Sequence, residues 1–372
     1  MYNMRQDITG LRAIAVISVV LFHITHVFKP LGLSIPGGFL GVDIFFVISG
    51  YLMTKIIVTG IREQRFSFWE FYKRRAKRIC PALLVVVIVS TSIAILLFRS
   101  DPIRQTCREA LVSLGFISNF RFARALDYFD GGDFSHLFLH TWSLSVEFQF
   151  YLLYPLLIAI TCRFLSTNAL PKVLAILCLA SFITALIWTD INPRQSYYLL
   201  PSRACELLVG SLAFFYPIEL LRDKLALRLN ADTSIIKVME PKVVEIVGIF
   251  ILIVSFIIIN NVGVGVWPNG LLILPMLGTW LCIAANNKLS ILRGRFFQSL
   301  GLWSYALYLV HWPIIVFSSA LGWAQYALWL LLPILLCGYL IHILVERRRN
   351  FGYKFTALYL LVALAINTTD ST

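Results

Sequence analysis

The sequence predicts an all-α fold, a bundle of helices that crosses a membrane many times. The 372 residues are 59% hydrophobic and 14% charged, whereas soluble domains have about 45–50% apolar and about 25% charged residues. A soluble protein needs a polar shell that this composition cannot supply. Long apolar runs, rather than short alternating segments, favour helices over an outer-membrane barrel. These observations exclude a soluble globular enzyme, a disordered chain and a coiled coil.

Apolar runs of about 20 residues define the individual spans. The first run carries Arg12, His23 and His26 and lacks a small-residue cleavage site, so we interpret it as a membrane span rather than a signal peptide. Residues 1–345 form the expected transmembrane domain, and 346–372 form a basic cytoplasmic turn and an eleventh helix leading outside. The expected spans are 11–28, 37–58, 81–98, 147–162, 172–189, 199–216, 243–260, 267–286, 300–319, 325–345 and 355–367.

The distribution of positive charge predicts the orientation. With the N-terminus in the cytoplasm, the cytoplasmic connections carry 22 Lys and Arg residues and the opposite connections carry seven, five of them in the polar loop 99–141. Cytoplasmic loops of membrane proteins are enriched in Lys and Arg. We therefore expect a cytoplasmic N-terminus and an external C-terminus. The net charge of +13 is explained by these loops, so we expect no nucleic-acid partner.

The seven cysteines show neither a disulfide framework nor a CxxC metal pattern, and we interpret them as small packing residues. The sequence also contains no HExxH, GxSxG or Walker motif. A metal centre and a serine-hydrolase site of the usual kind are therefore not expected.

The first span carries two ionisable residues on one face. Arg12 and His23 are eleven residues apart, which is three helical turns plus about 20° and roughly 16 Å along the axis. An ionisable group at membrane depth costs several kcal/mol and is a candidate functional residue. Arg12 could hold an anionic group and His23 could transfer a proton. The alternative is that Arg12 extends to the membrane surface and His23 is a packing residue.

A basic run, KRRAKR over residues 73–78, precedes the third span. Arg75 and Arg78 share a helical face, and Arg74 is similarly spaced from Arg78. Composition alone favours an anchor that contacts anionic lipid. The alternative is a clamp for the phosphates of a nucleotide-like ligand, because the guanidinium fork fits phosphate oxygens.

The stretch HTWSLSVEFQFY enters the fourth span from outside and brings His140 and Glu147 together at the membrane surface. We expect Ser143 to cap the helix and Glu147 to lie in its first turn. Three further sets of polar residues occur within spans. They are Asp43 at the start of the second, Arg203 and Glu206 in the sixth, interpreted as an intramembrane ion pair, and His311 in the ninth.

Six motifs in order resemble the membrane acyltransferase-3 family, in particular its branch that O-acetylates bacterial surface polysaccharides. The resemblance covers nearly the whole chain, and the motif series ends at LVERRR with Glu346. The family usually has a second acid after Glu147, where this sequence has Phe148. The motifs are DITGLRAIAVISVVLFH, GGFLGVDIFFVISGYL, FYKRRAKRICPALL, LHTWSLSVEFQFYLLYP, SRACELLVG and LGLWSYALYLVHWPIIV.

The resemblance implies a bundle of about ten helices in the bacterial inner membrane that moves an acetyl group from cytoplasmic acetyl-CoA to a glycan hydroxyl at the periplasmic face. It implies no metal. In longer related proteins an extra helix leads to a periplasmic SGNH-hydrolase-like domain, and the eleventh span is expected to be such a linker. Arg12, His23, Arg75 and Arg78 match residues on which the family relies, and supporting positions are matched by Asp43, His140, Trp142, Ser145, Glu147, Arg203, Glu206 and His311.

We expect Arg75 and Arg78, with Arg74 beside them, to bind the donor phosphates. His23 would act as general base or as transient acyl carrier, oriented by Glu147 or Asp43, and Arg12 would neutralise phosphate or polarise a carbonyl. Lipopolysaccharide O-antigen is the expected acceptor, ahead of peptidoglycan and exopolysaccharide. A donor with an acyl chain longer than acetyl is the alternative to acetyl-CoA. The rival interpretations are a transporter or flippase for an acyl donor or glycan lipid, which would form no ester, and a membrane scaffold.

Overall fold

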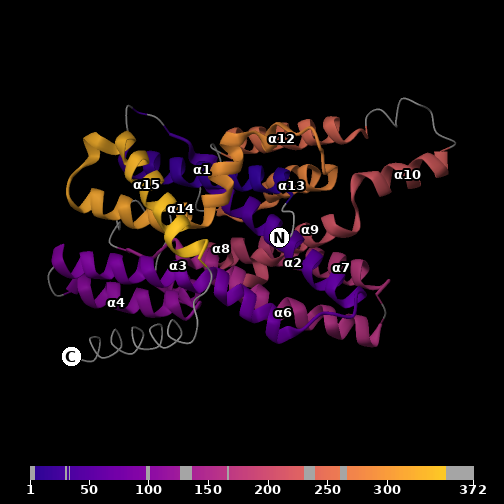
Figure 1. The fold of residues 1–372 in the computed structure, drawn as a ribbon, viewed down its shortest axis with the longest axis horizontal. Helices are drawn as coiled ribbons and strands as arrows, with labels where there is room; N and C mark the ends of the chain where they lie inside the picture. Colours follow the sequence, from indigo (N-terminus) through magenta and orange to yellow (C-terminus); the bar gives the residue numbers. More distant parts are fainter. Residues whose placement is uncertain are drawn as a thin grey trace. The chain divides into compact units, whose positions relative to one another are not determined.

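The computed structural model describes residues 5–29, 32, 34–97, 101–125, 136–165, 167–229, 239–259 and 266–348 (Figure 1). Within these ranges every regular element is a helix, which confirms the predicted fold class. Nine of the described helices are long and apolar enough to cross a membrane, and a shorter apolar helix, Gly270–Ala285, lies at the predicted span 267–286. The predicted eleventh span, 355–367, lies outside the described residues.

The helices follow one another in the order of the predicted spans, with two additions between the third and fourth spans and a further one, α10, between the sixth and seventh. The longer elements, labelled in Figure 1, are α1 (Gln6–Phe28), α2 (Gly41–Arg62), α3 (Phe68–Leu97), α4 (Asp101–Leu114), α5 (Ser118–Ala125), α6 (Thr141–Phe164), α7 (Leu170–Ile191), α9 (Leu200–Phe215), α10 (Ile218–Leu229), α12 (Pro241–Ile258), α13 (Ile273–Ala285), α14 (Arg295–Ala320) and α15 (Leu331–Ile341). The short segments are η2 (Pro36–Leu40), α8 (Pro193–Tyr198), η5 (Gly270–Leu272), η6 (Ile291–Arg293), η7 (Ala324–Leu330) and η8 (His342–Glu346).

The two additions, α4 and α5, form where the sequence predicted only a polar loop. Both are too short to span a membrane. In α4, Cys107, Ala110 and Leu114 are buried, whereas Arg104 and Arg108 are exposed. This spacing of three and four residues is the pattern of an amphipathic helix. A search for 20-residue apolar runs does not detect it.

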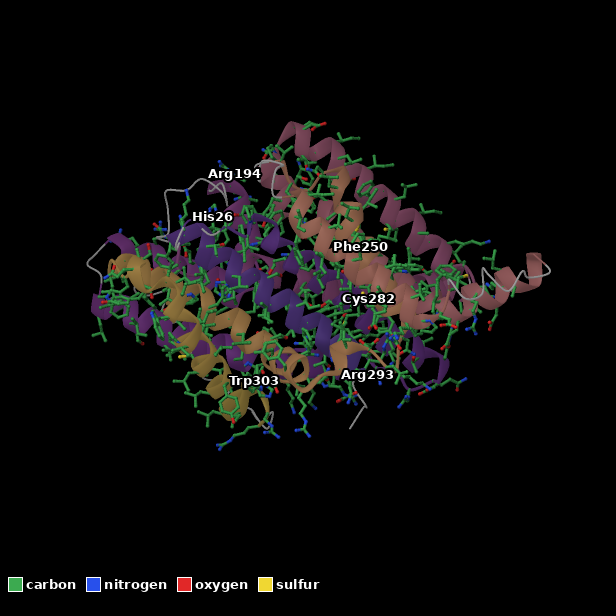
Figure 2. The ribbon with its side chains drawn as sticks, turned by 90° about the horizontal axis from the view of Figure 1, so that it is seen from above. His26, Arg194, Phe250, Cys282, Arg293 and Trp303 are labelled. Atoms are coloured by element: carbon green, nitrogen blue, oxygen red, sulfur yellow. The ribbon has the colours of Figure 1, made fainter. Side chains whose placement is uncertain are left out.

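The chain divides into two compact units. Unit 1 comprises Met1–Val19, Ile35–Phe66 and Leu153–Leu302. Within it α2 packs against α9, α9 against α7, and α12 against α13. The α12–α13 contact is close because Gly248 and Gly278 face each other. Cys282 of α13 is buried, whereas Phe250 of α12 is 63% exposed (Figure 2), as expected for a side chain facing lipid.

Unit 2 comprises Val20–Ser34, Ser67–Leu152 and Trp303–Thr372. Within it α3 packs against α4, and the hydroxyl of Tyr305 on α14 donates to the backbone oxygen of Ile79 on α3 at 2.8 Å. Trp303, labelled in Figure 2, packs on Tyr339 of α15 with ring centroids 4.8 Å apart. These contacts join α3, α14 and α15 into one bundle.

Buried hydroxyl groups attach α4 and α5 to the start of α6 inside unit 2. Thr141 bonds to Ser113 at 2.7 Å and to Ser118 at 2.9 Å. Ser118 in turn bonds to Ser145 at 2.8 Å. We call Ser113, Thr141, Ser118 and Ser145 the hydroxyl chain. Because all four side chains are buried, each hydroxyl needs a hydrogen-bond partner in the protein. The hydroxyl chain therefore links α4 and α5 to the first turns of α6.

Candidate active site

Three histidines from distant parts of the sequence meet in unit 2. His23 lies on α1, His311 on α14, and His140 in the turn before α6, and all three are buried. His23 Nδ1 and His311 Nε2 are 3.0 Å apart, a hydrogen-bond distance. The ring centroids of His140 and His311 are 5.6 Å apart. The three residues form the histidine cluster, and each was a candidate in the sequence.

A tryptophan fixes one side of the cluster. The Trp312 ring meets the His23 ring edge-on with centroids 4.8 Å apart, and Trp312 Nε1 donates to the backbone oxygen of His136 at 2.8 Å. The His136 ring is hydrogen-bonded to the buried carboxylate of Glu109 on α4. Glu109 also accepts from the backbone N–H of Phe138 at 3.2 Å. The amphipathic helix α4 therefore holds the turn that carries His140.

Tyr308 on α14 connects this turn to α6. Its hydroxyl donates to the backbone oxygen of His140 at 2.6 Å. Since that hydroxyl has one proton, the hydroxyl of Ser143, also 2.6 Å away, donates to the Tyr308 oxygen. The prediction that Ser143 caps the helix is wrong, because α6 already begins at Thr141 and Ser143 lies inside its first turn.

His140 is chemically distinct from the other two histidines. Among the described residues, neither ring nitrogen makes a hydrogen bond of normal geometry. His140 precedes α6, and burial, followed by the nearby His311, lowers the pKa of its imidazole well below the ordinary value. The neutral ring therefore offers both a donor and an acceptor nitrogen inside a buried site.

Glu147 lies further along α6 and interacts with two tyrosines of α14. Its carboxylate accepts a hydrogen bond from Tyr151 and interacts electrostatically with Tyr305 and Tyr308. Because α6 begins at Thr141, Glu147 is in the second turn and not in the first turn as predicted. His23 Nδ1 is bonded to His311, and the orienting role expected of Glu147 or Asp43 stays a prediction.

The arginines of α3 separate into two groups. Arg74 is exposed and lies 3.9 Å from Glu70 across one turn. Arg75 and Arg78 are half-buried. The Arg75 guanidinium lies 5.9 Å from the centre of the Phe71 ring, and Arg78 interacts electrostatically with Tyr305. Arg75 and Arg78 are thus each partly covered and near an aromatic residue, whereas Arg74 is exposed.

Unit 1 contains a separate buried charge cluster. Arg203 on α9 lies 2.8 Å from Asp43 on α2 and 3.2 Å from Glu206. This confirms the predicted Arg203–Glu206 ion pair and adds Asp43 to it. Arg12 lies in the part of α1 that belongs to unit 1, and it too is buried.

Two other predicted positions are structural in this arrangement. Ser145 belongs to the hydroxyl chain and also donates to the backbone oxygen of Thr141 at 3.2 Å. Trp142 is completely buried in the first turn of α6. Ser145 therefore links α6 to α5 by a hydrogen bond, and Trp142 packs the first turn of α6 into the protein interior.

Sequence reasoning assigned no role to several polar residues of unit 2. His342 Nδ1 bonds to Glu346 at 2.6 Å in η8, a widened helical segment that packs against α3. Glu346 interacts electrostatically with Tyr305. A usable signal was present for the tyrosines, because Tyr305, Tyr308 and His311 recur at steps of three in an otherwise apolar helix.

A family described as "Acyltransferase domain", Acyl_transf_3, matches residues 5–345. The chain belongs to this acyltransferase family. The match includes every candidate site residue, from Arg12 to His311. No solved structure is significantly similar to the chain.

Similar curated proteins are bacterial O-acetyltransferases. The chain is 33% identical over 333 residues to "O-acetyltransferase OatA" of Staphylococcus aureus, covering 86% of this chain and 52% of that protein. It is 29% identical over 332 residues to "Peptidoglycan O-acetyltransferase OatA" of Listeria monocytogenes, covering 84% and 50%. For "Putative peptidoglycan O-acetyltransferase YrhL" of Bacillus subtilis, the identity is 30% over 321 residues, covering 83% and 48%. The chain spans about half the length of these relatives.

Proposed function

We propose that the chain is a membrane-embedded O-acetyltransferase that moves an acetyl group from acetyl-CoA to a hydroxyl of a cell-wall glycan. The observation that carries the proposal is the buried histidine cluster, in which His23 is bonded to His311 beside His140. Acyl transfer to a hydroxyl needs a base that removes the hydroxyl proton, and neutral imidazole is suited to that task at cellular pH.

The donor is proposed to bind from the cytoplasmic face. Arg75 and Arg78 are half-buried neighbours on α3, and guanidinium groups bind phosphate oxygens in pairs. The exposed Arg74 would add only long-range attraction. This orientation rests on the excess of Lys and Arg in the connections on the N-terminal side. The same excess supports the proposal that the chain lies in the cytoplasmic membrane with its N-terminus in the cytoplasm and its C-terminus outside.

Peptidoglycan is the proposed acceptor. Two of the relatives are named for peptidoglycan, which favours it over the O-antigen expected from the resemblance alone. Both acceptors are glycans that offer a hydroxyl at the outer face of the membrane, so the chemistry at His23 is the same. The two acceptors are separated by isolating each polymer and measuring its ester-linked acetate.

The test expresses the chain in a bacterial host that lacks O-acetylation of its own. Acetate released by mild base is measured from purified peptidoglycan, and lipopolysaccharide is examined by proton NMR. Wild type is expected to add acetate to peptidoglycan, and His23→Ala is expected to fall to the level of the empty host, because the proposed base is lost. Membrane levels of the variants are matched with an epitope tag.

His26→Ala is the matched control, since His26 lies one turn further along α1 and stacks on Phe22. It should retain wild-type acetate. Full acetylation by His23→Ala would overturn the role of His23, and acetate confined to lipopolysaccharide would replace peptidoglycan by O-antigen. Passage of intact acyl-CoA or glycan lipid through proteoliposomes, with no ester formed, would support a transporter instead.

A further inference from the structure

The proton positions in the histidine cluster follow from one backbone carbonyl. His311 Nδ1 lies 2.7 Å from the backbone oxygen of Tyr308. A carbonyl oxygen can only accept, so Nδ1 of His311 carries the proton of this bond. Among the described residues His311 is bonded to no carboxylate, and a buried charge without a counter-charge is costly. His311 is therefore neutral, and its Nε2 holds a lone pair.

The same reasoning extends to His23. Its Nδ1 lies 3.0 Å from Nε2 of His311. Because that nitrogen of neutral His311 can only accept, the proton between the rings belongs to His23 Nδ1. A neutral imidazole carries one N–H, so the lone pair of His23 is on Nε2. The hydrogen bonds thus run from His23 through His311 to the Tyr308 carbonyl.

We propose that His311 is a positioning residue that fixes His23 in the Nδ1-protonated tautomer, so that His23 Nε2 is the atom that accepts the acceptor hydroxyl proton. The inference deepens the proposed function and rests on it. It replaces the carboxylate that often orients a catalytic histidine with a second imidazole anchored on a backbone oxygen.

The step balances at this nitrogen. As the acceptor oxygen bonds to the acetyl carbonyl carbon, its proton moves to His23 Nε2. The C–S bond of the thioester then breaks, and the thiolate takes the same proton, leaving the acetyl ester, free coenzyme thiol and neutral His23. During the step the imidazolium donates through Nδ1 to His311, which stabilises the positive charge that develops.

The rest of the surroundings holds the rings in place. Trp312 and Phe22 contact the His23 ring, while His140 and Tyr308 contact the His311 ring. The titratable groups around this pair include His140 and Tyr308, with His26 beyond Phe22 and Glu147 near Tyr308. Within this set only the Tyr308 carbonyl accepts from His311 Nδ1.

Two substitutions separate the hydrogen bond from the packing. His311→Gln can place its carboxamide oxygen near the position of Nε2 and keep an acceptor for His23, whereas His311→Phe keeps a ring and removes the acceptor. The purified full chain in lipid nanodiscs is assayed with acetyl-CoA and peptidoglycan disaccharide peptides. We expect His311→Phe to lower kcat by about 100-fold or more, with little change in the KM for acetyl-CoA. His311→Gln should stay within about tenfold of wild type, the scale of one neutral hydrogen bond.

A spectroscopic measurement tests the tautomer without turnover. Nitrogen-15 NMR of histidine-labelled protein in nanodiscs shows which ring nitrogen of each of the six histidines carries the proton. The His23 signals are assigned by their loss in His23→Gln. His23 should be protonated at Nδ1 in wild type and in His311→Gln, and should no longer be held in that form in His311→Phe.

The outcomes separate the two proposals. An Nε2-protonated His23 in wild type would overturn the inference, as would an Nδ1-protonated His23 in folded His311→Phe. Equal losses of kcat in both His311 variants would reduce His311 to a packing residue. If wild type transfers no acetyl group to peptidoglycan fragments, the proposed acceptor fails, while the NMR result still decides the tautomer.

Discussion

Arg203 is a buried arginine whose charged partners come from its own helix and from α2. It lies between the carboxylates of Asp43 and Glu206, and all three side chains are buried in unit 1. Its guanidinium also lies 5.6 Å from the centre of the Phe46 ring. The positive charge of Arg203 compensates the two buried carboxylates, because an uncompensated charge in a low-dielectric interior raises the free energy of the folded state.

Replacing Arg203 by Leu is therefore expected to destabilise the protein by about 3–5 kcal/mol. The measurement is the unfolding midpoint of the detergent-solubilised protein. Arg222→Leu is the control, because its partner Asp223 is exposed and an exposed pair contributes about 0–1 kcal/mol. Equal midpoints for Arg203→Leu and wild type would show that the cluster is not a net source of stability.

At this scale the sequence was informative only for local pairs. Arg203 and Glu206 are three residues apart, so a helix brings them together whatever the tertiary fold. Asp43 is 160 residues from Arg203, and His23 is 288 residues from His311. Helical periodicity identifies each as a polar residue in an apolar helix, but their partners depend on how the helices pack.

At the scale of the helices, α2 and α9 approach each other closely at two glycines. A Cβ at Gly210 would collide with the backbone oxygen of Val47, and a Cβ at Gly50 would collide with the backbone oxygen of Leu207. Small residues at a helix interface allow the backbones to come close, which is a common way for membrane helices to pack.

Gly210→Ala should consequently force α2 and α9 apart and cost about 1–3 kcal/mol or more, as overpacking does. The unfolding midpoint and the yield of folded protein measure the effect. Gly270→Ala is the matched control, because a Cβ there meets nothing within 4 Å. A Gly210→Ala protein as stable as the Gly270→Ala protein would contradict the tight contact.

The elements themselves were predictable in proportion to their length and hydrophobicity. The long spans follow from apolar runs because lipid forces helices to satisfy their own backbone hydrogen bonds. The start of α6 was misplaced, because residues 138–142 enter the helix through backbone turns, with Thr141 N bonding to Phe138 O at 3.0 Å and Trp142 N bonding to Leu139 O at 3.1 Å. Tertiary contacts of Ser143 with Tyr308 then override its ordinary capping preference.

At the scale of the whole molecule, a series of electrostatic interactions and hydrogen bonds runs through unit 2. Arg78 interacts with Tyr305, Tyr305 with Glu147, and Glu147 with Tyr308. Tyr308 contacts both His140 and His311. In the proposed function the donor phosphates bind at Arg75 and Arg78 and the acetyl group is transferred at His23, and the long pantetheine arm of acyl-CoA would connect the two places.

This arrangement predicts that binding and turnover can be altered separately. The double variant Arg75→Gln/Arg78→Gln should raise the KM for acetyl-CoA by about 10–100-fold, corresponding to one or two charge-assisted hydrogen bonds, with kcat largely retained. Arg74→Gln, which removes an exposed charge beside Glu70, should change the KM by less than about threefold. A fall in kcat at unchanged KM would place the two arginines in the chemical step instead.

The order of motifs along the chain predicted the family, and the family is confirmed. The site was predictable as a set of residues and not as a geometry. The sequence identified His23, His140 and His311 as separate candidates. Nothing in their spacing indicated that the His23 ring would be hydrogen-bonded to the His311 ring.

The hydroxyl chain of Ser113, Ser118, Thr141 and Ser145 also has an evolutionary consequence. Each hydroxyl satisfies its neighbour in a buried setting, so an apolar replacement at one position leaves the next hydroxyl without its partner, at about 1–3 kcal/mol. Substitutions at such coupled positions are therefore expected to occur together rather than one at a time. Homologous sequences that lose one of these hydroxyl groups are therefore expected to carry compensating changes at the others, while the exposed arginines of α4 vary independently.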